Sequence, residues 1–177
     1  MRQPPQPASQ ASPHHRRWVR RESILSRLER HVGMRIVLFA APAGFGKSTT
    51  MAQWAAELAC HGRLTAWLSC EATDNDEGAF LSHLVGALRH LVQSPAELDL
   101  AFQSSPIPQL EVVLSALVAG FAARDAEITL FFDDYHVIET EAVKRFMERL
   151  TRQAPANVAF VIGSRNLPDL QLGKLRV

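Results

Sequence analysis

The residues from Ala41 to Thr49, APAGFGKST, decide the fold of this chain of 177 residues. An unbroken apolar run, Met34–Ala40, precedes them, and a run of that length without a polar face predicts a strand buried in a parallel sheet. Apolar residues at helical spacing follow, and they predict a helix over Ser48–Ala59. The stretch is therefore expected to turn a buried strand into a helix, and the N-terminus of such a helix attracts anions.

The stretch matches the phosphate-binding pattern G-x-x-x-x-G-K-[ST] at Gly46, Lys47 and Ser48, and it departs from the pattern at Ala41. Gly44 and Gly46 can adopt backbone torsions closed to other residues, which lets successive N–H groups face a phosphate. We expect the Lys47 ammonium on the β- and γ-phosphates and the Ser48 hydroxyl on Mg²⁺. A chance glycine-rich turn is the alternative. The expected nucleotide-binding residues are Ala43, Gly44, Phe45, Gly46, Lys47, Ser48 and Thr49.

The alternation of apolar strand and amphipathic helix continues over the rest of the chain. Further strands are expected over residues 64–70, 128–132 and 158–162, and further helices over residues 21–31, 78–92, 106–123 and 140–152. This order predicts an α/β domain with a parallel sheet and right-handed crossovers. Together with the phosphate-binding pattern, it predicts a P-loop NTPase fold, a three-layer sandwich, over residues 18–177.

The composition is that of a soluble globular protein. The apolar share is 47%, the charged share 21% and the net charge +1, which argues against an acidic tail or a surface that coats nucleic acid. No apolar run approaches the roughly 18 residues that span a bilayer, and no secretory signal opens the chain. We therefore expect a cytoplasmic protein without a membrane partner, and a disordered lead over Met1–Arg17. Cys60 and Cys70 lack metal-ligand spacing and are expected to be free thiols, although a disulfide between them stays open.

Two carboxylates follow the apolar strand Ile128–Phe132. A P-loop enzyme needs an acid at a strand end beside the phosphates, and we expect Asp133 to hold Mg²⁺ there, through a coordinated water. Asp134 occupies the position of the residue that polarises the attacking water, and its short side chain predicts slow hydrolysis. The alternative is an acidic turn in which Asp134 caps a helix.

The strand over residues 158–162 ends close to Arg165. When this strand is inserted between the phosphate-binding strand and the acidic strand, its end lies near the γ-phosphate. Arg165 is then a candidate sensor that helps to stabilise charge during transfer, and a surface arginine is the alternative. Tyr135 and His136 are expected to hold their loop in shape. The acidic stretch over residues 71–77 lacks calcium-loop spacing and predicts a solvated loop, with Asp76 as a helix cap.

Stretches spread along the chain carry a family resemblance. They are RRESIL at 20–25, AAPAGFGKST at 40–49, QW at 53–54, AWLS at 66–69, DND at 74–76, FL at 80–81, FDDYH at 132–136 and SR at 164–165 with Pro168. Together they resemble the ATPase module of large LuxR-type, MalT-like transcriptional activators, which belongs to the STAND class of signal-transduction ATPases. Ala41 and Asp134 depart from the general P-loop pattern but agree with the pattern of this family.

The resemblance implies a regulatory switch that binds ATP or ADP with Mg²⁺. ADP would hold a closed monomer, while ATP and an inducer would favour a self-associating form whose C-terminal domain binds promoter DNA. Val19 and Arg20 would lie near the adenine. The resemblance also implies an ASCE-type sheet, truncated here before its fifth strand and before the DNA-binding domain, which leaves the phosphate-binding strand at an edge. A P-loop kinase and an inactive truncated remnant are the alternatives.

Overall fold

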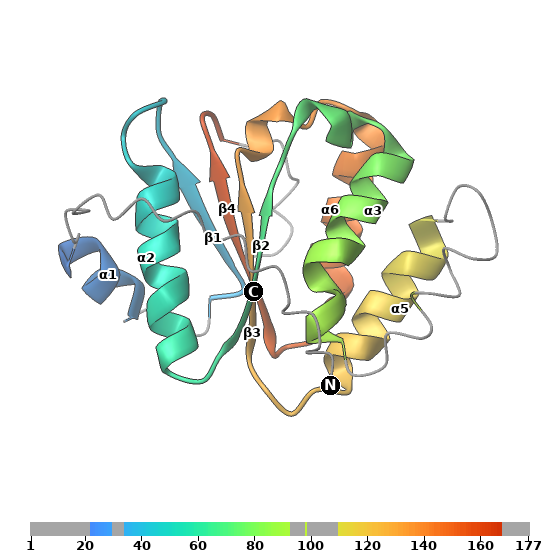
Figure 1. Cartoon of the computed structure of the whole chain (residues 1–177), viewed down its shortest axis with the longest axis horizontal. Helices are drawn as coiled ribbons and strands as arrows, with labels where there is room; N and C mark the ends of the chain where they lie inside the picture. The colour runs from blue at the N-terminus through green and yellow to red at the C-terminus, as the bar shows by residue number, and fades with distance from the viewer. Residues whose placement is uncertain (1–21, 30–33, 93–97, 99–109, 168–177) are drawn as a thin grey trace, which may run out of the picture.

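A computed structural model describes residues 22–29, 34–92, 98 and 110–167 (Figure 1). The expected disordered lead over residues 1–17 lies outside these ranges, and so do Val19 and Arg20. The strands are β1 (Ile36–Ala40), β2 (Leu64–Ser69), β3 (Ile128–Asp133) and β4 (Val158–Ser164). The helices are α1 (Glu22–Glu29), α2 (Lys47–Cys60), α3 (Glu77–Leu88), α5 (Leu110–Ala122) and α6 (Glu141–Gln153), with 3-10 turns η1 (Ala72–Asn75), η2 (Arg89–Leu91) and η3 (Tyr135–Val137).

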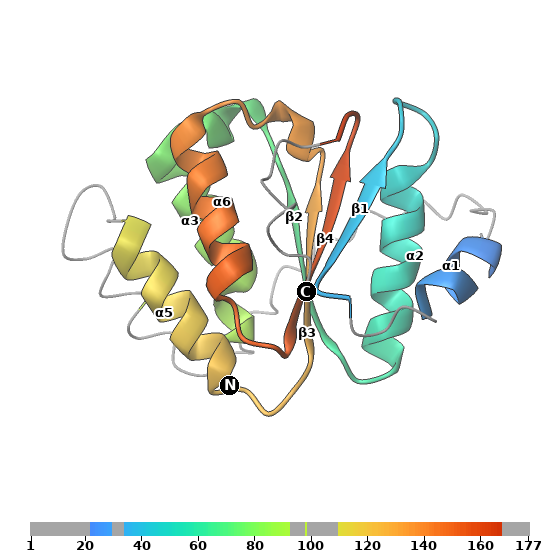
Figure 2. The same cartoon turned by 180° about the vertical axis from the view of Figure 1, so that it is seen from behind.

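The four described strands form one parallel sheet in the order β1-β4-β3-β2. Helices α1 and α2 lie on one side of the sheet, and α3, α5 and α6 lie on the other (Figures 1 and 2). The expected α/β sandwich is confirmed, and β4 is inserted between β1, which precedes the glycine-rich loop, and β3, which ends in Asp133. Because β1 pairs only with β4 among the described strands, it lies at an edge of this sheet, as the resemblance implied.

Strand β3 is the most protected element, since every one of its side chains is buried. The larger core lies between the sheet and helices α3, α5 and α6, where the α6 residues Val143, Phe146, Met147 and Leu150 face inward at helical spacing. A smaller core lies under α2 and contains Met51, Trp54, Leu58, Phe131 and Val161. Both cores hold the carboxyl ends of the strands at one edge of the sheet, where ligands bind in open α/β folds.

One helix is shorter than the sequence predicts. The helix expected over residues 78–92 ends at Leu88 and tightens into η2. Arg124 donates hydrogen bonds to the carbonyl oxygens of His90, Leu91 and Val92, so this side chain takes over carbonyl groups that a helix end leaves unpaired. Within the described ranges the other expected elements are confirmed to within a few residues, while residues 21, 30–31 and 106–109 of the expected helices lie outside these ranges. No helix in the described part of the chain is long and apolar enough to cross a membrane.

Candidate nucleotide-binding site

The glycine-rich loop joins β1 to α2 and contains two glycines with left-handed backbone torsions. Gly44 and Gly46 have φ angles of 82° and 76°, a region that side chains rarely allow. The first helical turn is secured by Thr50, whose N–H and hydroxyl both donate to the Gly46 carbonyl oxygen, at 3.0 and 2.8 Å. At the other end of the loop, the Ala41 N–H donates to the Ser164 carbonyl oxygen at 3.3 Å. The loop is thus fastened to both α2 and β4.

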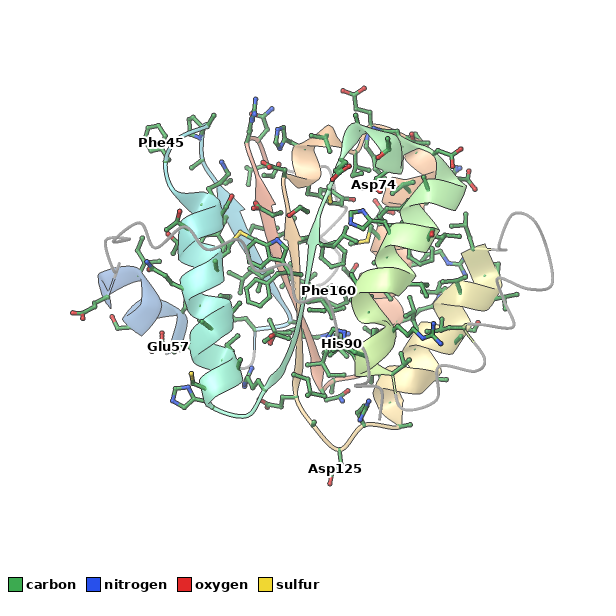
Figure 3. The ribbon with its side chains drawn as sticks, viewed as in Figure 1. Phe45, Glu57, Asp74, His90, Asp125 and Phe160 are labelled. Atoms are coloured by element: carbon green, nitrogen blue, oxygen red, sulfur yellow. The ribbon has the colours of Figure 1, made fainter. Side chains whose placement is uncertain are left out.

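Lys47 folds back onto the loop that precedes it. Its Nζ donates to the carbonyl oxygens of Ala41 and Pro42, at 2.5 and 3.1 Å. The ammonium therefore lies within the loop, where it could exchange carbonyl oxygens for phosphate oxygens. Phe45 lies at the outer end of the loop and is 62% exposed, so its ring points away from the protein core (Figure 3).

Asp133 and Asp134 differ in their surroundings although they are adjacent. Asp133 ends β3, is only 5% exposed, and its Oδ1 accepts a hydrogen bond from the Asp134 N–H at 2.9 Å. The Asp134 side chain is 50% exposed and makes no helix-capping hydrogen bond, although the residue precedes η3. Asp134 has a φ of 52°, and it is the one residue other than glycine with a positive φ in the described ranges. The geometry therefore does not support the helix-cap alternative for Asp134.

One cavity of about 310 Å³ brings most of the predicted residues together. Its walls come from the loop, the start of α2, the end of β3 and the end of β4. The lining residues are Ala43, Gly44, Gly46, Lys47, Ser48, Thr49, Asp134 and Arg165. Of the predicted residues that the structure describes, Phe45 and Asp133 do not line the cavity, and Asp133 is buried at the carboxyl end of β3. Arg165 is exposed and faces this cavity from the end of β4.

Gly163 is a site residue that the sequence analysis missed. A Cβ atom at this position would lie 2.8 Å from Asp133 Oδ1 and 2.7 Å from Met51 Sδ, both too close for real contacts. The end of β4 can therefore lie against the Asp133 carboxylate only because residue 163 has no side chain. A glycine directly before the polar pair Ser164-Arg165 is the one sequence signal that could have indicated this close approach.

The negative charges at this edge of the sheet affect the buried thiol of Cys70. Burial raises its pKa to about 12, and the carboxylates of Asp74, Asp133 and Asp134 contribute to the rise. The expected free thiols are confirmed, with Cys60 exposed and Cys70 buried. The described residues contain no group of three or more His, Cys, Asp or Glu side chains that could hold a metal ion.

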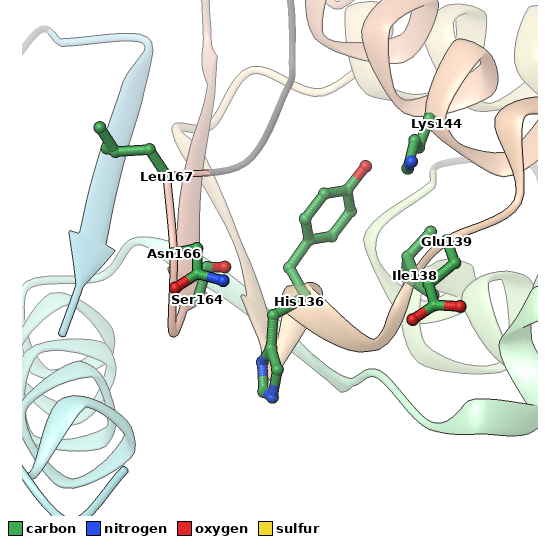
Figure 4. A pocket seen from close by; sticks show the side chains of 8 residues that line it. His136, Ile138, Glu139, Lys144, Ser164, Asn166 and Leu167 are labelled. Atoms are coloured by element: carbon green, nitrogen blue, oxygen red, sulfur yellow. The ribbon is translucent and has the colours of Figure 1, made fainter. Parts of the chain in front are cut away.

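A second hollow of about 220 Å³ lies behind the same two strand ends (Figure 4). Tyr135, His136 and Ser164 line it, whereas their neighbours Asp134 and Arg165 line the first cavity. Tyr135 is buried, and neither its hydroxyl nor His136 Nδ1 has a hydrogen-bond partner in the structure. Burial also raises the pKa of Tyr135. The expectation that these two side chains hold their loop in shape therefore finds no support from hydrogen bonds of these two atoms.

The acidic stretch before α3 differs from the expected solvated loop. Asp76 caps α3 as expected, because its Oδ1 accepts from the Ala79 N–H at 2.9 Å. Asp74, in contrast, is 1% exposed, and its carboxylate oxygens lie 3.1 and 3.2 Å from His83 Nδ1. Its Oδ2 also accepts from the Glu71 N–H at 2.8 Å. Hydrogen bonds of this kind compensate for the burial of a carboxylate.

Sequence comparisons place the chain beside transcriptional regulators. No protein-family model matches it. It is 32% identical over 162 residues to the HTH-type transcriptional regulator MalT of Yersinia pestis, and 32% identical over 158 residues to MalT of Klebsiella pneumoniae. Each match covers 89% of this chain and 17% of the regulator, so the chain spans about a sixth of the length of these relatives.

Solved structures agree with the fold. Cdc6p from Pyrobaculum aerophilum matches 82% of this chain and 39% of its own, with a TM-score of 0.52 and 17% identity. A chain of the Drosophila ORC bound to DNA matches over 87% of this chain and 82% of its own, with a TM-score of 0.53 and 14% identity. At such low identity these likenesses concern the fold alone. The chain is therefore similar in sequence to a part of the MalT regulators, and its fold is that of the P-loop NTPases.

Proposed function

We propose that this chain is the Mg·ATP-binding module of a signal-transduction ATPase, which works as a switch and hydrolyses ATP slowly. The observation that carries the proposal is the cavity of about 310 Å³. It combines a loop with two left-handed glycines, a helix N-terminus, an ammonium, a guanidinium and a carboxylate. Backbone N–H groups and cations bind phosphate oxygens. A carboxylate beside them can orient the water molecule that attacks the terminal phosphate.

The polar groups in and beside the cavity suit a nucleoside triphosphate with its metal ion. Lys47 would move from the carbonyl oxygens of Ala41 and Pro42 to phosphate oxygens. Ser48 offers a hydroxyl, and Asp133 a buried carboxylate, as the oxygen ligands that Mg²⁺ prefers. When bound, the metal would neutralise phosphate charge. Arg165 would sense the terminal phosphate from the end of β4, and ADP would leave it without this partner.

The exposure of Asp134 supports slow hydrolysis. Its carboxylate is half exposed, and the distance from its Oδ1 to His136 Nδ1 is 3.7 Å, too long for a hydrogen bond. Asp134 would orient a water molecule, but its carboxylate has few contacts that would fix its direction. Loose orientation of this kind lowers the rate of proton transfer while leaving affinity for the nucleotide intact.

Slow turnover suits a module in which the bound nucleotide is the signal. The matched regulators are named as HTH-type transcriptional regulators. By that similarity we propose that ATP at this site favours self-association and promoter binding through other parts of a longer protein, in response to an inducer. Val19 and Arg20, outside the described residues, are proposed to lie near the adenine.

Calorimetric titration of the chain with Mg·ATP and Mg·ADP tests the proposal. Lys47→Ala should weaken Mg·ATP binding by at least about tenfold, because a hydrogen bond to a charged group contributes roughly 1.5–3 kcal/mol. Lys144→Ala is the matched control, since Lys144 pairs with Glu141 on α6 and does not line the cavity. It removes the same charge and should leave the affinity unchanged.

Each outcome separates the proposal from its alternatives. Saturable binding that Lys47→Ala abolishes supports the cradle. No binding by the unaltered chain contradicts the proposal and favours an inactive remnant. Transfer of the γ-phosphoryl group to a small acceptor, in place of release as phosphate, favours a kinase.

A further inference from the structure

Two chain segments run side by side at the carboxyl edge of the sheet and are joined at both ends. The first runs from Cys70 to Asn75, after β2, and the second from Asp133 to Thr140, after β3. At one end, the Cys70 N–H donates to the Asp133 carbonyl oxygen at 2.9 Å. At the other end, the Thr140 hydroxyl donates to the Asn75 carbonyl oxygen at 2.8 Å. Asp134 lies in the second segment, between these two connections.

The Asn75 side chain makes most of the second connection. Its Oδ1 accepts from the backbone N–H groups of Glu139 and Thr140, at 2.7 and 3.0 Å. Its Nδ2 donates to the carbonyl oxygens of Val137 and Ala72, at 2.8 and 3.2 Å. Because two N–H donors face one end of the amide and two carbonyl acceptors face the other, only one orientation of the amide satisfies all four contacts.

The residues that precede Asn75 are held in place by hydrogen bonds. Asn75 ends η1, whose first residues are held by a reciprocal pair of hydrogen bonds between Glu71 and Asp74. Asp74 is buried against His83 of α3. The backbone at Asn75 is therefore anchored to α3 and to the core beneath this helix.

Asp134 needs such support. A residue other than glycine at positive φ costs free energy and keeps this conformation only where its surroundings impose it. On one side, β3 fixes Asp133. On the other side, the Asp134 carbonyl oxygen accepts from the Val137 N–H at 3.0 Å, and the Val137 carbonyl oxygen accepts from Asn75.

We propose that Asn75 is a positioning residue of the nucleotide site, which holds the segment after β3 so that Asp134 faces the phosphates. The role in hydrolysis rests on the proposed function, while the effect on the Asp134 backbone does not. A carboxylate at position 75 could still accept from Glu139 and Thr140, but it could not donate to Val137 or Ala72. Only an amide serves both sets of partners.

The test is the Asn75→Asp variant of the full chain, with Asp76→Ala as the matched control on the same loop. Asp76→Ala removes a helix cap but no contact with the segment after β3. In Asn75→Asp we expect kcat for ATP hydrolysis to fall by at least about tenfold, because misplacement by about 1 Å can cost as much as 100-fold. The affinity for Mg·ATP should stay within a factor of about three in both variants, since Asn75 does not line the cavity.

Backbone NMR of the same proteins gives a readout that does not depend on activity. Chemical shifts and three-bond couplings report the φ of Asp134, and we expect them to change in Asn75→Asp and to stay the same in Asp76→Ala. An unchanged Asp134 backbone in Asn75→Asp overturns the proposal, whether or not nucleotide binds. A changed backbone in a chain that binds no nucleotide supports the positioning and contradicts the proposed function. If Asn75→Asp does not fold, Thr140→Val, which removes one hydroxyl donor, is expected to show the same change at smaller size.

Discussion

Replacing Gly163 with alanine should damage both the stability of the domain and its nucleotide site. The added Cβ would lie 2.8 Å from Asp133 Oδ1 and 2.7 Å from Met51 Sδ, whereas ordinary contact begins at 3.4 Å. Either β4 or these two groups must move by about 0.6 to 0.7 Å. Met51, a residue of α2, is fully buried and Asp133 is nearly so, which leaves little free room on either side.

We expect Gly163→Ala to lower the free energy of unfolding by about 1–3 kcal/mol, the usual cost of an extra methyl group in a packed core. If Asp133 takes up the movement, the affinity for Mg·ATP should fall by about tenfold, because one contact to a charged group contributes roughly 1.5–3 kcal/mol. Denaturant unfolding gives the first quantity and calorimetry the second. The backbone torsions of Gly163 are open to alanine, so the added Cβ is the only perturbation.

Gly86→Ala is the matched control. Gly86 is exposed on α3, and a Cβ there would have no neighbour within 4 Å. Alanine should therefore stabilise the helix by about 0.5–1 kcal/mol and leave nucleotide binding unchanged. If Gly163→Ala behaves like Gly86→Ala in both assays, the close approach of β4 to Asp133 does not exist in solution, and the reasoning about this edge of the sheet fails.

Three further predictions concern single groups. Asp134→Ala should have a free energy of unfolding about 1 kcal/mol lower than Asp134→Gly, because glycine adopts a φ of 52° without strain and alanine does not; equal stabilities in denaturant unfolding would contradict this. Both variants should bind Mg·ATP but release no phosphate. Alkylation followed by mass spectrometry should modify exposed Cys60 at once and buried Cys70 only as fast as the domain unfolds, and rapid reaction at both thiols would show that Cys70 is accessible. The pKa of the Cys70 thiol is about 12 in the folded chain against an ordinary 9.0, so the thiol loses its proton at lower pH in the unfolded chain. The contribution of this thiol to the free energy of unfolding should therefore be complete below pH 9.0 and disappear as the pH rises toward 12. In Cys70→Ala the free energy of unfolding should fall less steeply over this alkaline range.

The phosphate-binding loop could be predicted from the sequence because its causes are local. An apolar run, two glycines and a helix start lie within one stretch. Gly44 and Gly46 were expected to adopt backbone torsions closed to other residues, and their positive φ angles confirm this. The order of strands and helices followed from periodicity in the same way. The meeting of Asp134 and Arg165 in one cavity depended on the inserted strand, which only the family resemblance implied, through its ASCE-type sheet.

The features that were missed depend on contacts between distant residues. Gly163 matters because of Asp133 and Met51, and no pattern around residue 163 names those partners. The stretch around Asp74 looked solvated from its acidic composition, but His83 and the Glu71 N–H satisfy the buried carboxylate.

The position of β1 has a consequence for the newly made protein. Strand β1 pairs with β4 alone among the described strands, and Ile36 finds its partner Phe160 roughly 120 residues later. As the chain leaves the ribosome, the phosphate-binding loop is made early but has no sheet to join. The first strand can be enclosed only after the last described strand has been synthesised. During elongation the apolar strand β1 therefore remains without its partner β4, and exposed apolar segments of this kind are bound by chaperones that act on nascent chains.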